Sequence, residues 1–306
     1  MIGTLGLGTW ALGGPYEFGW GPVDDNRSMD LIRSARSRGV TWLDTAPAYG
    51  TGHAERVVGR AIRDLPPDER PAIFTKVGRV WTDESPGSVF TDLRPANLRG
   101  QIEASLSRLG VDNVACIQVH RPDRESSTPL EQTWEQLAQL AEEGYASALG
   151  LCNVSDDEYR RCAAVRHVDY VQLPASLVRP PDERLLDACA GLRTRTLAFS
   201  PLGSGLLSGH FSPERLAPDD WRARNRFFAG EYLAQAERIV DELRSVADEV
   251  DATVPAVAIA WALADDRISS CIVGARTLNQ LDGWVGAAGI ELTQEQREKL
   301  SKALSD

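Results

Sequence analysis

Short apolar runs in this chain each end at a polar residue that is able to take part in chemistry, and helix-like stretches separate one run from the next. The carboxyl ends of the strands in a parallel α/β barrel meet at one face, and functional groups collect there. The pattern therefore predicts such a barrel, with its site at that face. The polar residues that end the runs are Asp44, Lys76, His120, Asn153, Gln172 and Ser200.

Eight predicted strands alternate with helices, which is typical of a (β/α)8 TIM barrel. The predicted strands are 4–9, 40–44, 72–77, 114–119, 146–151, 168–172, 194–199 and 270–273. The predicted helices are 25–38, 53–63, 95–109, 129–143, 155–165, 181–190, 231–250, 255–264, 277–285 and 293–304, the last an extra C-terminal helix. Long loops at 10–24, 78–94 and 203–230 are expected at the carboxyl-end face, where long loops are usually functional.

Composition narrows the class of protein. With 306 residues, the chain fits a single α/β barrel domain over 1–306. A net charge of −11 argues against nucleic acid or an anionic membrane as partner. No signal peptide and no apolar run of about 18 residues is visible, so a membrane span is not expected. The 5 cysteines are scattered without a CxxC pair, which favours reduced core residues in a cytoplasmic protein and no metal site.

Lysine is scarce, because arginine supplies nearly all of the positive charge. The lysines are Lys76, Lys299 and Lys302, and the last two fall in the charged C-terminal helix. Lys76 ends an apolar strand, where an ammonium is costly unless it is paired. Since the chain uses arginine almost everywhere else, we expect that this position needs an amine. Unlike a guanidinium, an amine can shift its own pKa or tune the pKa of a neighbouring group.

The segment Gly6-Leu7-Gly8-Thr9-Trp10-Ala11 matches the dinucleotide-binding pattern G-x-G-x-x-A. That pattern requires a helix directly after it and an acidic residue about 20 residues further on. The residues that follow are not helical, and Asp44 is too far away. A Rossmann domain is therefore rejected.

Asp44, Tyr49, Lys76 and His120 form a more specific set. An ammonium beside a phenol stabilises the phenolate and lowers the phenol's pKa. A carboxylate makes the buried ammonium tolerable, and a histidine can orient a carbonyl oxygen. Each residue alone also has a structural explanation, as loop cap, packing or core histidine. Together, at successive strand ends, they indicate a unit that protonates a carbonyl while hydride arrives.

These residues carry a family resemblance. The segment from Asp44 to Gly50, with Gly52-His-Ala-Glu55 behind it, resembles the first signature of the aldo-keto reductases. Residues 105–112, leading to Gln118-Val-His120, resemble the second, and residues 272–280 resemble the cofactor segment. Within this family, the amino-acid sequences of residues 6–14 and 200–209 most resemble those of the bacterial and potassium-channel-β-like branch.

The resemblance implies roles for individual residues. Tyr49 would be the general acid, Lys76 would tune its pKa, Asp44 would orient the pair and His120 would guide the carbonyl. The cofactor would be NADPH, with NADH possible, and the partner a small carbonyl compound. The residues that would hold the cofactor are Gly8, Thr9, Trp10, Cys152, Asn153, Gln172, Phe199, Ser200, Leu202, Ser204, Gly274, Arg276, Thr277 and Gln280.

The chain also departs from the family pattern. Cys152 replaces the usual serine, alanine and serine follow Gln172-Leu-Pro where Tyr-Asn is commoner, and Gly283-Trp284 replaces an acidic-Asn pair near the adenine. Because an acidic chain repels a phosphorylated dinucleotide, the preference for NADPH needs a local cation. Arg276, ahead of a helix start, is expected to bind the 2′-phosphate.

The expected activity is reduction of an aldehyde or ketone to an alcohol by NAD(P)H. The alternative is a cofactor-binding, redox-sensing regulatory subunit with little turnover, although the complete set of four residues favours the enzyme. A metal-dependent barrel hydrolase would need a ligand cluster that 4 histidines do not supply. Candidate substrate-pocket residues are Trp10, Trp20, Trp81 and Arg121, with Trp221 and Phe227–Phe228 as further possibilities.

Overall fold

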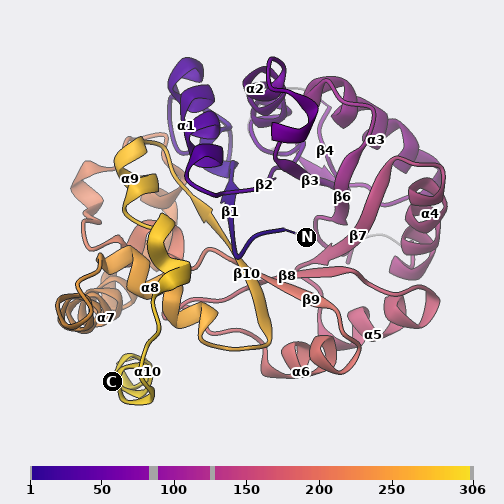
Figure 1. The fold of residues 1–306 in the computed structure, drawn as a ribbon. Coiled ribbons are helices and arrows are strands. Elements are labelled where there is room, and N and C mark those ends of the chain that lie inside the picture. Colours follow the sequence, from indigo (N-terminus) through magenta and orange to yellow (C-terminus); the bar gives the residue numbers. More distant parts are fainter. Residues whose placement is uncertain (1, 83–88, 125–127, 304–306) are drawn as a thin grey trace.

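The computed structural model describes residues 2–82, 89–124 and 128–303, and in it the main sheet is a closed parallel barrel (Figure 1). Around the barrel the strands follow the order β1-β10-β9-β8-β7-β6-β3-β2. This confirms the predicted (β/α)8 architecture. The barrel strands are β1 (Leu5–Gly8), β2 (Trp42–Asp44), β3 (Ala72–Val77), β6 (Val114–Val119), β7 (Ala146–Cys152), β8 (Tyr170–Pro174), β9 (Arg195–Phe199) and β10 (Ile268–Gly274).

Helices surround the barrel (Figure 1), and several of them begin at a side chain that caps the first turn. Ser155 forms a reciprocal capping box with Glu158, and Thr293 forms one with Gln296. The helices are α1 (Asp25–Ser37), α2 (His53–Ile62), α3 (Pro95–Leu109), α4 (Leu130–Glu142), α5 (Asp156–Val165), α6 (Glu183–Gly191), α7 (Gly230–Glu249), α8 (Val254–Leu263), α9 (Leu278–Asp282) and α10 (Gln294–Lys302).

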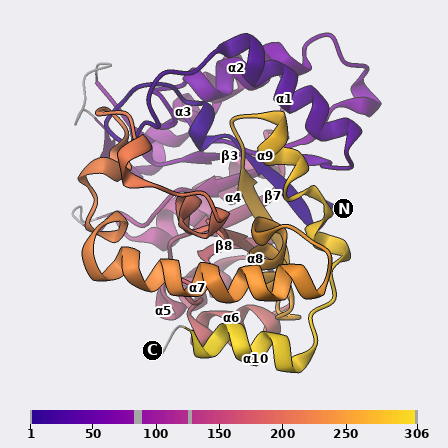
Figure 2. The ribbon, with the colours of Figure 1, turned by 90° about the vertical axis from the view of Figure 1, so that its left-hand side faces the viewer.

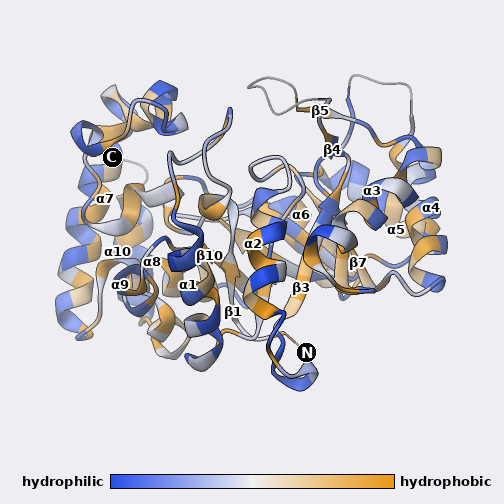
Figure 3. Ribbon diagram, turned by 90° about the horizontal axis from the view of Figure 1, so that it is seen from above, coloured by the Kyte–Doolittle hydropathy of each residue, from blue (hydrophilic) through white to orange (hydrophobic). Residues whose placement is uncertain are grey.

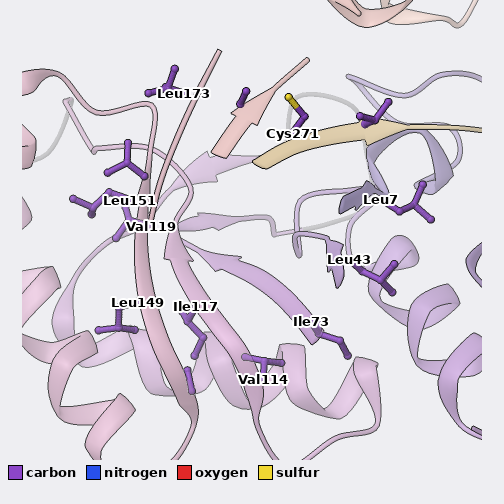
Figure 4. Close-up of a cluster of buried hydrophobic side chains, with 14 of the residues drawn as sticks. Leu7, Leu43, Ile73, Val114, Ile117, Val119, Leu149, Leu151, Leu173 and Cys271 are labelled. Atoms are coloured by element: carbon purple, nitrogen blue, oxygen red, sulfur yellow. The ribbon is translucent and has the colours of Figure 1, made fainter. Parts of the chain in front are cut away.

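Side chains alternate between the inside and the outside of the barrel along each strand. Outward residues such as Leu43, Ile117 and Leu151 belong to the large core between strands and helices (Figure 4). Inward residues include Trp42 and Phe74, whose rings lie 5.0 Å apart in a smaller inner cluster. The carboxyl-end half of the barrel interior is thereby left to polar side chains.

Gly6 makes room for the inner cluster. A Cβ atom at this position would lie 2.2 Å from the Trp42 ring, so the strand admits no larger residue there. The G-x-G-x-x-A pattern is therefore β1 followed by a 3-10 turn, Trp10–Leu12, and the rejection of a Rossmann reading is confirmed.

Three predicted segments contain structure that the sequence did not reveal. The described part of loop 78–94 holds a small antiparallel hairpin, β4 (Arg79–Val80) with β5 (Phe90–Thr91), at the carboxyl-end face (Figure 3). Loop 203–230 contains 3-10 turns, and the predicted helix 277–285 ends at Asp282 before a 3-10 turn, Val285–Gly289. Residues 83–88 of the loop and residue 304 of the predicted last helix lie outside the described residues.

A second apolar cluster covers one side of the barrel between β9 and β10. It joins α7, α8 and α10 through residues such as Leu243, Val257 and Leu300, and Figure 2 shows α7 running across this side with α10 beneath it. Among the described residues no helix has the length and apolar character to cross a membrane.

Helices α2 and α3 are tied to β3 by a buried carboxylate. Glu55 is fully buried and accepts hydrogen bonds from Thr75 Oγ1 and Arg108 Nε, each at 2.6 Å. Arg108 also lies over the Trp81 ring at 5.5 Å. A buried charge of this kind is tolerated because its partner and its hydrogen bonds are both present.

We expect Arg108→Met to lower the free energy of unfolding by about 3 kcal/mol or more, because it leaves the Glu55 carboxylate buried without its counter-ion. Urea denaturation followed by circular dichroism measures the change. The control is Arg99→Met, which removes an exposed pair with Glu143 and should cost less than about 1 kcal/mol. Equal effects of the two substitutions would show that Glu55 does not depend on Arg108.

Candidate active site

Asp44 is the acceptor around which the polar half of the barrel interior is arranged. It ends β2, is only 3% exposed, and accepts a hydrogen bond of 2.6 Å from Lys76 Nζ. Its second oxygen accepts from the side-chain amides of Gln118, at 3.3 Å, and Gln172. Four strands of the barrel therefore meet at one carboxylate.

Lys76 connects this carboxylate to the phenol of Tyr49. Its ammonium also donates to the Thr45 carbonyl at 2.9 Å and to Tyr49 Oη at 3.2 Å, so all three of its protons have acceptors. Burial lowers the pKa of Lys76, but the Asp44 carboxylate and its hydrogen bond, together with the electrostatic effects of Tyr49 and Cys152, outweigh burial, so the pKa lies above its ordinary value. Lys76 is thus a permanent cation beside the phenol.

Tyr49 lies in the turn that follows β2, and this turn aims its ring into the barrel mouth. The backbone N–H of Tyr49 donates to Ala46 O at 3.1 Å, and the Lys76 ammonium lies 5.0 Å from the centre of the Tyr49 ring. Burial raises the pKa of Tyr49 to about 12, while the charge of Lys76 acts in the opposite direction. The phenol therefore keeps its proton near neutral pH, and the ammonium stabilises the phenolate if that proton is passed on.

His120 follows β6 and completes the group. Its ring lies 5.9 Å from the Tyr49 ring at 89°, and Asn153 Nδ2 donates to its backbone carbonyl. Burial, followed by the positive charge of Lys76, holds the pKa of His120 well below its ordinary value, so the imidazole is neutral. Within the described part of the chain, its buried Nδ1 has no hydrogen-bond partner. The structure thus brings together all four residues that the sequence singled out.

A cavity of about 1120 Å³ opens beside these four residues and runs toward α9. Most of the residues predicted to hold a cofactor line it. They are Gly8, Trp10, Cys152, Asn153, Gln172, Phe199, Ser200, Leu202, Ser204, Gly274, Arg276 and Gln280. Its length along the barrel mouth suits an extended ligand.

The backbone after β9 suits the phosphates of a dinucleotide. Ser200, Gly203, Ser204 and Gly205 all have positive φ angles, and all but Gly203 line the cavity. Such turns direct backbone N–H groups to one side and form anion-binding concavities. At the far end, the buried Trp284 lines the cavity, and its indole N–H lacks a partner among the described residues. The cavity therefore fits a nicotinamide dinucleotide.

Two residues predicted to touch the cofactor, Thr9 and Thr277, make structural hydrogen bonds within the protein. Thr9 is fully buried and donates to the Asp44 carbonyl from both its backbone N–H and its hydroxyl. Thr277 caps α9 by accepting from Gln280 N. Neither lines the cavity, because each side chain or backbone amide is used to hold a neighbouring residue in place.

Arg276 lines the cavity, but it is already engaged. Nη1 donates to Trp20 O at 2.9 Å and Nη2 donates to Pro22 O at 2.7 Å, which ties β10 to loop 10–24. Burial lowers the pKa of this guanidinium. A bidentate grip on a 2′-phosphate would require it to give up these loop carbonyls.

Three tryptophans from two loops, 10–24 and 203–230, cover the barrel mouth. The Trp10 ring lies 5.2 Å from Trp221, 5.4 Å from Trp20 and 6.4 Å from Tyr49. Trp81, which was predicted to line the pocket, has its ring under Arg108 and is not among the residues that line these two cavities. Phe228 packs against Trp221 and Phe211 in a separate apolar cluster.

Sequence reasoning missed Gln118, which bonds Asp44 inside the barrel. A signal was present, because a glutamine two residues before His120 occupies an inward position of an otherwise apolar strand. It also missed Arg179, which lines the cavity and which folding brings to the site from a turn. Trp284, which the resemblance placed near the adenine only as a departure from the family pattern, lines the cavity too.

All five cysteines are free and buried, as predicted. Cys152 lies in the site, where its thiol donates to Gln118 Oε1 at 3.6 Å. Burial raises the pKa of this thiol, so it stays protonated and unreactive. The described residues contain no group of His, Cys, Asp and Glu side chains arranged to hold a metal ion.

Comparison with known proteins gives consistent results. The model of the aldo/keto reductase family matches residues 4–305. The chain is 31% identical to the NADH-specific methylglyoxal reductase of Escherichia coli, covering 95% of this chain and 91% of that protein. It is 30% identical to the aldo-keto reductase YhdN of Bacillus subtilis, with 99% and 90% covered. The structure of a glycerol dehydrogenase from Gluconobacter oxydans superposes with a TM-score of 0.88 at 31% identity, covering 99% of this chain and 92% of that one.

The buried pair at the site allows a double-mutant cycle. We expect Lys76→Met to lower the free energy of unfolding by about 3 kcal/mol or more, because it leaves the Asp44 carboxylate without its counter-ion. Adding Asp44→Asn should recover part of this loss, since a neutral amide needs no counter-ion. Urea denaturation of both single variants and the double variant gives the coupling energy. Strictly additive effects would contradict a coupled pair.

Proposed function

The chain belongs to the aldo/keto reductase family, and from that premise we propose that Tyr49 donates the proton in its reaction while Lys76, Asp44 and His120 support this step. The reaction is reduction of an aldehyde or ketone to an alcohol by a reduced nicotinamide dinucleotide. When bound, the dinucleotide supplies the hydride. The protein contributes position, electrostatics and the proton.

The observation that carries this assignment is the unbroken contact from Asp44 through Lys76 to Tyr49. The ammonium lies 2.6 Å from the carboxylate and 3.2 Å from the phenol oxygen. As the phenol gives its proton to the carbonyl oxygen, negative charge appears next to a cation that is already in place. Stabilisation of this kind needs no rearrangement at the moment of reaction, and it is a major source of catalysis.

His120 would orient the carbonyl. Because its pKa is depressed, the ring near neutral pH is an uncharged imidazole that can donate one N–H to the carbonyl oxygen. A neutral donor does not compete with Tyr49 to supply the proton. It fixes the substrate oxygen between the two rings, whose centres are 5.9 Å apart.

The cofactor would extend along the large cavity. Asn153 and Gln172 present amides and Phe199 an aromatic ring at the nicotinamide end, the left-handed turns from Ser200 to Gly205 suit the diphosphate, and Gln280 lies at the adenosine end. The proposed preference is NADPH over NADH, supported by the arginines of this cavity on a chain of net charge −11. The free, buried cysteines support a cytoplasmic location.

We expect Tyr49→Phe to lower kcat for carbonyl reduction by about 10²-fold or more, because the ring remains while the proton donor is lost. The assay is the loss of absorbance at 340 nm when NADPH meets an aromatic aldehyde. Cofactor affinity, measured by fluorescence quenching, should barely change. The matched control is Tyr145→Phe, whose hydroxyl is bonded to Glu103 on an exposed face and which should keep normal turnover.

Near-normal turnover in Tyr49→Phe would remove Tyr49 from the mechanism. If the wild-type protein bound NADPH tightly but failed to reduce any aldehyde or ketone, the regulatory alternative would replace the enzyme.

For Arg276→Ala we expect weaker binding of both cofactors, because loop 10–24 loses the hydrogen bonds to Trp20 and Pro22. We expect an additional loss of about 1.5–3 kcal/mol for NADPH alone if the guanidinium also binds the 2′-phosphate. Titration of both cofactors by fluorescence quenching separates the two terms. Equal losses for NADPH and NADH would assign Arg276 to the loop and not to the phosphate.

A further inference from the structure

A second cavity, of about 670 Å³, meets the reacting residues from the side of β6 and β8. Tyr49 and His120 line both this cavity and the large one, so the two spaces join at the phenol and the imidazole. Trp10, Tyr16 and Phe18 form its aromatic wall. Its position and size suit the part of a carbonyl substrate that lies beyond the reacting carbon.

The walls of this substrate cavity carry an excess of positive charge. Among the described residues, four arginines line it, namely Arg79, Arg121, Arg124 and Arg179, against one carboxylate, Asp182. The carboxylate is used to cap α6, accepting from two backbone N–H groups. On a chain of net charge −11, a cluster of this sign creates a local field that attracts anions.

Two of these arginines are already committed to protein groups. Arg124 forms a bidentate pair with Glu158, at 3.2 and 3.0 Å. Arg79 donates to Thr91 Oγ1 and to Val89 O across the β4–β5 hairpin. These contacts hold the cavity wall in place.

Arg121 and Arg179 differ from the other two. In the parts of the chain that the structure describes, neither guanidinium makes a hydrogen bond or an ion pair. Arg121 directly follows His120, so it projects from the same strand end as the imidazole. Arg179 has its backbone held by Ser176 through N–H to O contacts of 3.0 Å in both directions, so its exposed side chain starts from a fixed point.

Arginines around the cofactor provide a contrast. Arg222 pairs with Asp220, Arg244 pairs with Asp241, and Arg276 bonds loop carbonyls. Arg121 and Arg179, in contrast to these three, have no partner for their guanidinium donors among the described residues and line the same cavity as Tyr49 and His120. The charge of Arg121 also reaches the imidazole, since it contributes, after burial, Lys76 and Arg79, to the lowered pKa of His120.

We propose that the substrate is an aldehyde or ketone that carries a carboxylate or phosphate group, which Arg121 and Arg179 bind while the carbonyl faces Tyr49 and His120. This inference rests on the proposed function. In the reaction, the carbonyl carbon gains a hydride from the reduced cofactor and the oxygen gains a proton from Tyr49, so the carbonyl becomes an alcohol and the cofactor is oxidised. The anionic group is unchanged, and it fixes the orientation of the molecule.

The test compares substrates that differ in charge. One pair is 4-carboxybenzaldehyde and its methyl ester, and the other is glyceraldehyde 3-phosphate and glyceraldehyde. With NADPH, we expect kcat/KM to be about ten- to a hundredfold higher for at least one anion than for its neutral partner, the range for charge-assisted hydrogen bonds. The preference should fall as salt concentration rises, and a preference confined to one pair identifies the anion as carboxylate or phosphate.

Variants then assign the effect to the two arginines. In the double variant Arg121→Gln/Arg179→Gln, the preference should disappear, mainly through a higher KM for the anion. Arg99→Gln removes one positive charge far from the cavity and should keep the wild-type preference. This inference alone would be overturned if the neutral substrates had the same kcat/KM as the anions. It would also be overturned if the preference for the anions survived in the double variant. If none of the four compounds is reduced, the proposed function fails and this inference fails with it.

Discussion

The buried ion pair between Asp44 and Lys76 is the constraint on which the rest of the site depends. Both side chains are almost completely buried, so each charge is tolerable only because the other lies 2.6 Å away and the remaining donors and acceptors are satisfied. Meeting that condition requires Gln118, Gln172 and the Thr45 carbonyl to converge from other strands and from the turn after β2. Lys76 also donates to the Thr45 carbonyl and to the Tyr49 hydroxyl, so the contacts that make the buried charges tolerable also hold the turn that carries Tyr49.

The polar centre is possible because the barrel interior is divided along its axis. Trp42 and Phe74 fill the half nearer the amino ends of the strands, and Gly6 leaves space for the indole. One inward position further along β2 and β3, the chain places Asp44 and Lys76. Water is thereby excluded from beneath the ion pair, which strengthens its electrostatic influence on Tyr49 and His120.

Arginine has two uses in this chain. Some guanidinium groups are structural, as where Arg108 neutralises buried Glu55 or Arg276 ties loop 10–24 to the end of β10. Arg121 and Arg179 line the substrate cavity, and their guanidinium groups make no hydrogen bond or ion pair among the described residues. Because the overall charge is negative, a local cluster of cations attracts anions toward this cavity.

Much of the fold followed from the sequence. Strand and helix positions agree to within about two residues for most elements, because the apolar runs and the polar residues that end them are local signals. The hairpin β4–β5 and the 3-10 turns escaped prediction, since two-residue strands and single turns have no periodicity to detect. α9 ends at Asp282, with Gly283 after it and the buried Trp284 beyond.

The sequence by itself determined which residues could carry the chemistry. Asp44, Lys76 and His120 were recognisable because they end apolar strands, and strand ends of a parallel barrel converge at one face. Only the tertiary structure decided how the residues are used. In the structure, Gln118 is a further hydrogen-bond partner of Asp44, and Thr9 and Thr277 form hydrogen bonds with neighbouring residues. The Trp81 ring lies under Arg108, and Arg276 donates hydrogen bonds to two loop carbonyls. The physical reason is that a strand end fixes where a side chain begins, whereas its hydrogen-bond partners come from segments up to 256 residues away.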